Sequence, residues 1–160
     1  AEAEAEIGWI IDLVSDIRSA RAETNVPAGA QVPLVFVGAS AQTRARVARW
    51  EDVLRRLARL GDISYAEAVP GGSIQLIVRG EVAALPLAGL VDLAAERARL
   101  EKELGKLDAD IARIDAKLAN ADFIARAPEE VVEEQKERRE AALLRQGKIR
   151  EALARLAGAA

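Results

Sequence analysis

The chain has 160 residues, with 23 Lys+Arg and 26 Asp+Glu, a formal net charge of −3, and no His, Cys or Met. Without His and Cys it cannot form a Cys/His zinc centre, a Ser-His-Asp or Cys-His catalytic group, or a disulfide. Ala supplies 34 residues and aromatic residues only 3% of the chain, a composition that favours long exposed helices over a compact globule.

The sequence also lacks recognisable targeting and cofactor-binding signals. No apolar run approaches the roughly 20 residues that cross a bilayer, and no signal-peptide pattern opens the chain. We therefore expect a cytoplasmic location and no membrane partner, and the lack of Met leads us to expect a piece of a longer protein. Because no metal-binding loop is present either, we expect no cofactor and no catalytic site in this piece.

The first predicted element is an amphipathic helix within residues 1–28. Its apolar residues recur at steps of three and four, which places them on one stripe: Ile7, Ile10, Ile11, Val14 and Ile17. The helix is expected to end near Pro27, because the residue before a proline disfavours helical backbone. No later segment offers this helix an obvious partner. We therefore interpret residues 1–28 as the last helix of a helical domain truncated upstream.

Residues 29–87 are predicted to form a small α/β unit. Four short segments have the composition of strands: 32–37, 63–65, 74–78 and 82–87. Between the first two, a helix is expected to begin at Ser40 and to be followed by Gly61. Its predicted apolar face holds Val47, Trp50, Leu54, Leu57 and Leu60.

Residues 88–160 carry the strongest pattern in the chain. In 90–119 a strict alternation of three and four selects Leu90, Leu93, Arg97, Leu100, Leu104, Leu107, Ile111, Ile114 and Leu118. In 128–157 the same rhythm selects Val132, Gln135, Arg139, Ala142, Gln146, Ile149, Leu153 and Leu156. The equal lengths and the short connection predict an antiparallel two-helix coiled-coil hairpin. We expect a mostly α protein in which this hairpin projects from a small mixed-sheet domain.

Two strings in the chain resemble the valyl-tRNA synthetase family. LANADFIARAPEEVV (118–132), preceded by ERARLEKEL (96–104), resembles its C-terminal coiled-coil arm. IRSARAETNVP (17–27) resembles the end of its anticodon-binding helical domain, so the resemblance spans essentially the whole chain. The family joins valine to its tRNA using ATP, but its HIGH-type and KMSKS-type motifs are absent here. The resemblance therefore implies a tRNA-binding arm for the outer corner of valine tRNA, with the parent's catalytic and anticodon-binding domains as further partners.

Basic residues are the candidates for contact with RNA phosphates. On the second helix of the hairpin they form a locally positive cluster: Arg138, Arg139, Arg145, Lys148 and Arg150. Further candidates are Arg113 and Lys117 on the first hairpin helix and Arg49 and Arg56 on the helix of the α/β unit. No aromatic residues are interleaved with them, which favours recognition of backbone and shape over base stacking.

Several alternatives stay open at this level. The hairpin could serve as a structural or protein-interaction element without RNA binding, including association between arms, and its mixed charges could simply be a solvated surface. Phe123 and Ile124 in the turn either close the loop over the seam or stack on unpaired bases. Gly105 and Gly147, inside the predicted helices, either weaken the middle of the arm so that it adapts to RNA or have no role.

Overall fold

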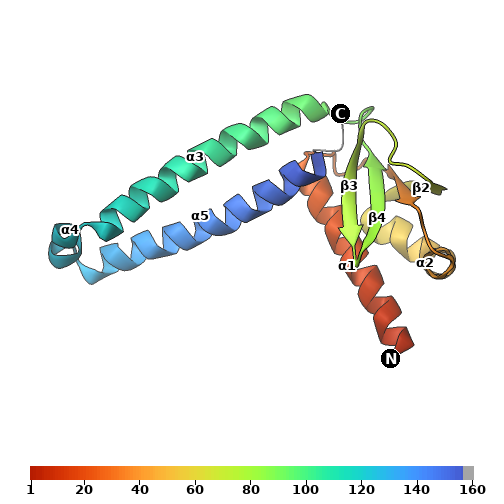
Figure 1. The fold of residues 1–160 in the computed structure, drawn as a ribbon, viewed down its shortest axis with the longest axis horizontal. Helices are drawn as coiled ribbons and strands as arrows, with labels where there is room; N and C mark the ends of the chain where they lie inside the picture. Colours follow the sequence, from red (N-terminus) through yellow and green to blue (C-terminus); the bar gives the residue numbers. More distant parts are fainter. Residues whose placement is uncertain (157–160) are drawn as a thin grey trace. The chain divides into compact units, whose positions relative to one another are not determined.

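The computed structural model describes residues 1–156, which form two compact units (Figure 1). The first comprises residues 1–96 with the described residues from Ala154 onward, and the second comprises residues 97–153. The elements are α1 (Glu2–Glu23), β1 (Val32–Val37), α2 (Ala41–Ala58), β2 (Leu60–Ala66), β3 (Ser73–Val78), β4 (Glu81–Pro86), α3 (Leu93–Ala119), α4 (Ala121–Arg126) and α5 (Glu129–Leu156). The predicted class, mostly helical with a small α/β unit, is confirmed.

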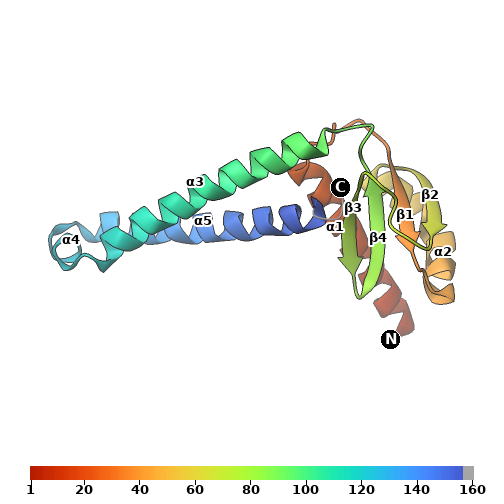
Figure 2. The ribbon, with the colours of Figure 1, turned by 45° about the horizontal axis from the view of Figure 1, so that its top comes forward.

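The sheet of the first unit is mixed, with strand order β2-β1-β4-β3 (Figure 2). β1 pairs in parallel with β2 through the α2 crossover and antiparallel with β4. β3 and β4 form a hairpin whose two turn residues, Arg79 and Gly80, have φ values of 49° and 82°, as a type I′ turn requires. α1 packs against β3 and α2, and α2 packs against β2, so both helices cover one face of the sheet.

The expectation that the first helix lacks a partner in the chain is wrong. Trp9, Leu13 and Ile17 of α1 are fully or almost fully buried, and the Trp9 ring stacks on Phe36 of β1 at 6.1 Å. Apolar burial against the sheet is thus the main force that holds this helix in place. That α1 ends an anticodon-binding domain of a longer protein stays a prediction.

Polar contacts also hold α1 to the rest of the unit. The Glu6 carboxylate accepts hydrogen bonds from Arg49 at 2.5 Å and from the Trp50 indole at 3.0 Å. At the β3–β4 turn, Arg79 donates to Asp12 at 2.7 Å.

The predicted stripe on α1 was partly wrong. Ile7 and Ile11 are 46% and 57% exposed, while the buried face consists of Trp9, Ile10, Leu13, Val14, Ile17 and Ala20. Periodicity alone identifies several overlapping stripes on a helix rich in apolar residues. The sheet and α2 select the one that is buried.

The end of α2 also differs from the prediction. Ser40 is the N-cap as expected, and its hydroxyl accepts the backbone N–H of Thr43 at 3.1 Å. The helix ends earlier than predicted, at Arg59 in the left-handed conformation (φ 52°), and both Leu60 and Gly61 belong to β2. Leu57, assigned to the apolar face, is 49% exposed. The left-handed residue turns the chain directly into the parallel strand, which leaves no room for a separate linker.

The two long helices of the second unit run antiparallel and are joined by the short helix α4 (Figures 1 and 2). Asn120 caps α4 by accepting the backbone N–H groups of Asp122 and Phe123. Every predicted seam position from Leu100 to Leu153 is buried or half-buried, while Leu90, which precedes α3, is 41% exposed. The predicted hairpin and its seam are therefore confirmed within this unit.

Candidate nucleic-acid interface

The seam divides the hairpin into two sides, and cross-helix contacts identify them. On the first, Arg145 of α5 pairs with Glu103 of α3. On the second, Arg139 pairs with Asp115. We call the first the Lys117 side, because helical spacing places Lys117 on it, and the second the Asp115 side. Helical spacing assigns to the Lys117 side the basic residues Arg99, Lys106, Arg113, Lys117, Arg138, Arg145 and Lys148 against Glu103, Asp110 and Glu134.

The Lys117 side contains a shallow groove between the two helices, lined by Asp110, Arg113, Ile114, Lys117, Gln135 and Arg138. Arg113 pairs with Asp110 one turn before it. Lys117 and Arg138 are exposed and form no ion pair with another described residue. The fold therefore brings together Arg113, Lys117 and Arg138, which the sequence assigned to separate groups. Their three positive charges exceed the single negative charge of Asp110 in the groove lining.

Arg138 and Arg139 lie on opposite sides of the seam although they are neighbours in sequence. Arg139 lines a different groove, with Leu118, Lys136, Glu140 and Leu143. On that Asp115 side it donates to Asp115, and Gln146 donates to Asp108 at 2.6 Å. The cluster predicted from 138–150 is consequently not one surface patch, because successive helical residues point about 100° apart.

Arg145 is committed to a bidentate contact with Glu103. Its Nε and Nη2 atoms donate to the two carboxylate oxygens at 2.8 and 3.1 Å. These hydrogen bonds are the leading reason why the pKa of Glu103 lies below its ordinary value. Such a pair neutralises the charge of Arg145 and links α5 to α3.

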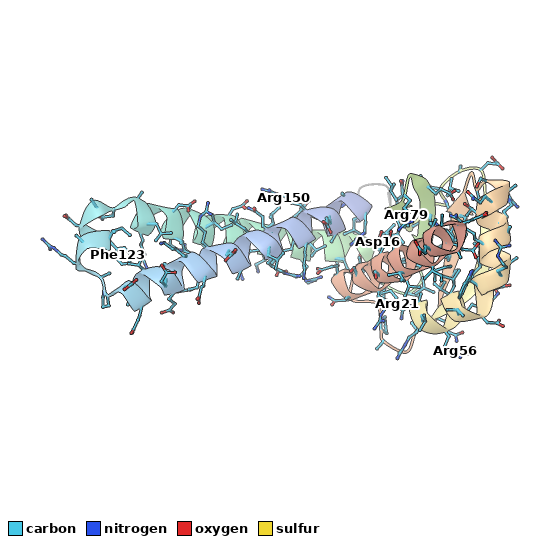
Figure 3. The ribbon with its side chains drawn as sticks, turned by 90° about the horizontal axis from the view of Figure 1, so that it is seen from below. Asp16, Arg21, Arg56, Arg79, Phe123 and Arg150 are labelled. Atoms are coloured by element: carbon cyan, nitrogen blue, oxygen red, sulfur yellow. The ribbon has the colours of Figure 1, made fainter. Side chains whose placement is uncertain are left out.

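The last two basic residues of the predicted cluster, Lys148 and Arg150, are exposed and form no ion pair with another described residue. Arg150 is labelled on α5 in Figure 3. Lys148 lies on the Lys117 side and Arg150 on the Asp115 side by helical spacing. Only Lys148 of the two extends the basic surface around Arg138.

In the first unit the two predicted residues on α2 have different surroundings. Arg49 is paired with Glu6, and its neighbours on α2 are also engaged: Arg55 pairs with Glu51 at 2.8 Å and Arg44 lies over the Tyr65 ring. Arg56 is instead exposed and lines a groove with residues of α1. Sequence counting could not separate the two cases, since the acid that neutralises Arg49 lies on another helix.

The tip of the hairpin is formed by α4, on which Figure 3 labels Phe123. Phe123 is half-buried, and Ile124 is 43% exposed. Phe123 thus partly closes the tip, whereas Ile124 remains available to solvent. Across residues 1–156 no group of His, Cys, Asp and Glu is arranged to hold a metal ion. In the same range no helix combines the length and the apolar character needed to cross a membrane.

Comparison with known proteins shows which proteins this chain is similar to. Residues 92–157 match the family described as "Valyl tRNA synthetase tRNA binding arm". Over 157 residues the chain is 64% identical to the valine–tRNA ligase of Rhodopseudomonas palustris, covering 98% of this chain and 16% of that protein. It is 62% identical over 155 residues to that of Bradyrhizobium diazoefficiens, covering 97% of this chain and 16% of the relative. The chain thus spans about one sixth of the length of these relatives, and the matched domain is a tRNA-binding arm rather than a catalytic domain.

Proposed function

We propose, from the match of this chain to the C-terminal region of valyl-tRNA synthetase, that it binds valine tRNA as an accessory part of a valine–tRNA ligase. In this proposal the chain adds affinity and orientation, and the attachment of valine takes place in other domains of the parent enzyme. The observation that carries it is the basic groove of Arg113, Lys117 and Arg138 on the domain matched as a tRNA-binding arm.

The mode of contact follows from the residue types at this groove. Lys117 and Arg138 offer uncompensated N–H donors, which bind phosphate oxygens and release counterions from the RNA. The groove holds no aromatic side chain among its lining residues, so base stacking does not contribute there. Recognition of backbone and shape suits a structured corner common to tRNAs, and we assign the outer corner of the tRNA to this surface.

The direct test removes the two free cations of the groove with K117A/R138A. We expect weaker binding of a valine tRNA transcript and a log–log salt slope reduced by about 1.5, since each lost phosphate contact removes roughly 0.7–0.9. Fluorescence anisotropy titrations across salt concentrations measure both quantities, and circular dichroism checks the fold.

The matched control is K136A/R139A, which removes one Lys and one Arg from the Asp115 side of the same hairpin. The proposal requires this control to bind more tightly than K117A/R138A. Equal losses would mean that net charge, rather than the groove, determines binding.

The alternative function is a protein-interaction hairpin. Its support is the exposed apolar side chains in the second unit: Ile124, Val131, Leu143 and Leu144, of which Leu144 is 64% exposed. Neighbouring positions on α5 such as Arg138 and Glu140 are charged, so these side chains do not make a broad apolar surface. Failure of the folded chain to bind valine tRNA at low salt would favour this alternative.

A further inference from the structure

Outside the hairpin, the first unit contains a groove whose charged lining residues are all arginines. Its lining consists of Arg18, Arg21, Ala22, Val26, Ala28, Arg56, Leu57, Ala58 and Arg59. The groove lies where the last turns of α1 and α2 meet the segment that follows α1, and Figure 3 labels Arg21 and Arg56 there. No carboxylate belongs to the described lining.

Two of the four arginines are built into the fold. Arg21 is 7% exposed and donates to the carbonyl oxygens of Arg59, Pro27 and Ala30, the last at 2.7 Å. Arg59 in turn donates to the carbonyl of Ala28. These bonds hold the two guanidinium groups against the backbone at the edge of the groove. Carbonyl oxygens satisfy the donors but carry no formal charge, so both positive charges remain uncompensated.

The other two arginines are free to bind a ligand. Arg18 and Arg56 come from different helices, are exposed, and form no ion pair with another described residue. Burial and the neighbouring Arg59 both lower the pKa of Arg21, which agrees with a crowded positive charge. Two exposed guanidinium groups beside two held arginines supply the N–H donors and the positive charge that bind a phosphate group.

We propose that this groove binds a backbone phosphate of RNA, as a second contact separate from the Lys117 side of the hairpin. The proposal rests on the proposed function, since it names the same RNA as the ligand. It involves Arg18 and Arg21, which the sequence did not suggest as RNA contacts, and explains why Arg56 lacks an acidic partner. An open groove of this charge also suits a chain of phosphates better than an enclosed small molecule.

The experiment uses two single-cysteine variants of the 160-residue chain, which has no Cys of its own. Ala22→Cys places a thiol in the groove, and we call it the groove thiol. Ala141→Cys places a thiol on α5, three residues after Arg138, and we call it the hairpin thiol. The rate of alkylation of each thiol is measured with and without saturating valine tRNA, and also with inorganic phosphate at matched ionic strength.

We expect tRNA to slow alkylation of both thiols several-fold. In R18A/R56A the protection of the groove thiol should disappear while that of the hairpin thiol remains, and the salt slope should fall by about 1.5. The matched control R44A/R55A removes the same charge from positions engaged with Tyr65 and Glu51, and should keep the protection of the groove thiol.

Three outcomes would overturn the inference. Protection of the hairpin thiol without protection of the groove thiol would leave the hairpin function standing and remove the groove from it. Protection of the groove thiol by inorganic phosphate but not by tRNA would assign the groove to a small anion. Protection of neither thiol by tRNA would overturn the groove and the proposed function together.

Discussion

Glu103 and Arg145 show how one residue pair joins the two long helices. The side chains are 35% and 36% exposed, and their two hydrogen bonds favour the charged form of the carboxyl group. The hydrogen bond from Arg145 is the largest cause of the lowered pKa of Glu103, and the charges of Arg145, Arg99 and Lys106 add to it, against a partial opposing effect of burial. This pair therefore stabilises the hairpin only while Glu103 is ionised.

We predict that Glu103→Gln destabilises the hairpin at neutral pH by less than about 1 kcal/mol, because both partners are partly solvated. The folded-state pKa lies below the ordinary value of 4.5, so the stabilisation is complete above pH 4.5. It is lost as the pH falls through the lower folded-state value. Urea denaturation of both proteins at a series of pH values measures the difference, which should vanish in strong acid.

The control for this prediction is Glu137→Gln on the exposed face of α5, where no ion pair joins Glu137 to another described residue. It should show no comparable difference at neutral pH. A deficit of Glu103→Gln that persisted unchanged in acid would show that packing, rather than charge, causes it.

At the scale of elements, α3 and α5 each contain one glycine within an unbroken helix. A Cβ atom built at Gly105 or Gly147 meets no described atom within 4 Å, and both positions are exposed. Neither glycine is therefore required for close packing. Their cost is entropic, since glycine loses more backbone freedom on folding than alanine does.

We predict that Gly105→Ala and Gly147→Ala each stabilise the hairpin by about 0.5–1 kcal/mol. Thermal denaturation followed by far-UV circular dichroism should show a higher midpoint for each variant. If the glycines also let the arm adapt to RNA, the double variant should bind valine tRNA more weakly. Unchanged affinity with higher stability would leave them without that role.

Gly72 provides the opposite control. It has a φ of 72°, and a Cβ atom there would lie 2.6 Å from Cβ of Ala88. Gly72→Ala should therefore lower stability, because it adds both backbone strain and a clash. Stabilisation by this substitution would undermine the physical basis of the helix predictions.

At the scale of the molecule, the described residues form two compact units. Trp9 and Trp50 both belong to the first unit, so tryptophan fluorescence reports on it alone. Far-UV circular dichroism includes a large contribution from the helices of the second unit. The two signals therefore distinguish unfolding of the units.

We predict that Ile111→Ala destabilises the second unit by about 2 kcal/mol, since Ile111 is 9% exposed in the middle of the seam. Its circular dichroism transition should move to lower urea while the tryptophan transition stays where it is. Equal shifts of both transitions would show that the units unfold as one cooperative structure.

The periodic pattern in 90–157 was sufficient to predict the hairpin and the burial of its seam. A coiled coil is specified by a local repeat, since each seam residue meets a partner with the same period. Ser40 and the strand compositions likewise located α2 and its neighbouring strands from local signals. The resemblance of 118–132 to the arm of valyl-tRNA synthetase was confirmed by the match of residues 92–157 to the model of that tRNA-binding arm.

Only the tertiary structure decided which cations are free. Arg49 and Arg145 are neutralised by acids 43 and 42 residues away in sequence, whereas Arg56 and Arg138 are not. The same holds for the partner of α1 and for the order of the strands. Helical periodicity depends on neighbours within one turn, but ion pairing and burial depend on which distant segments the fold brings within a few ångströms.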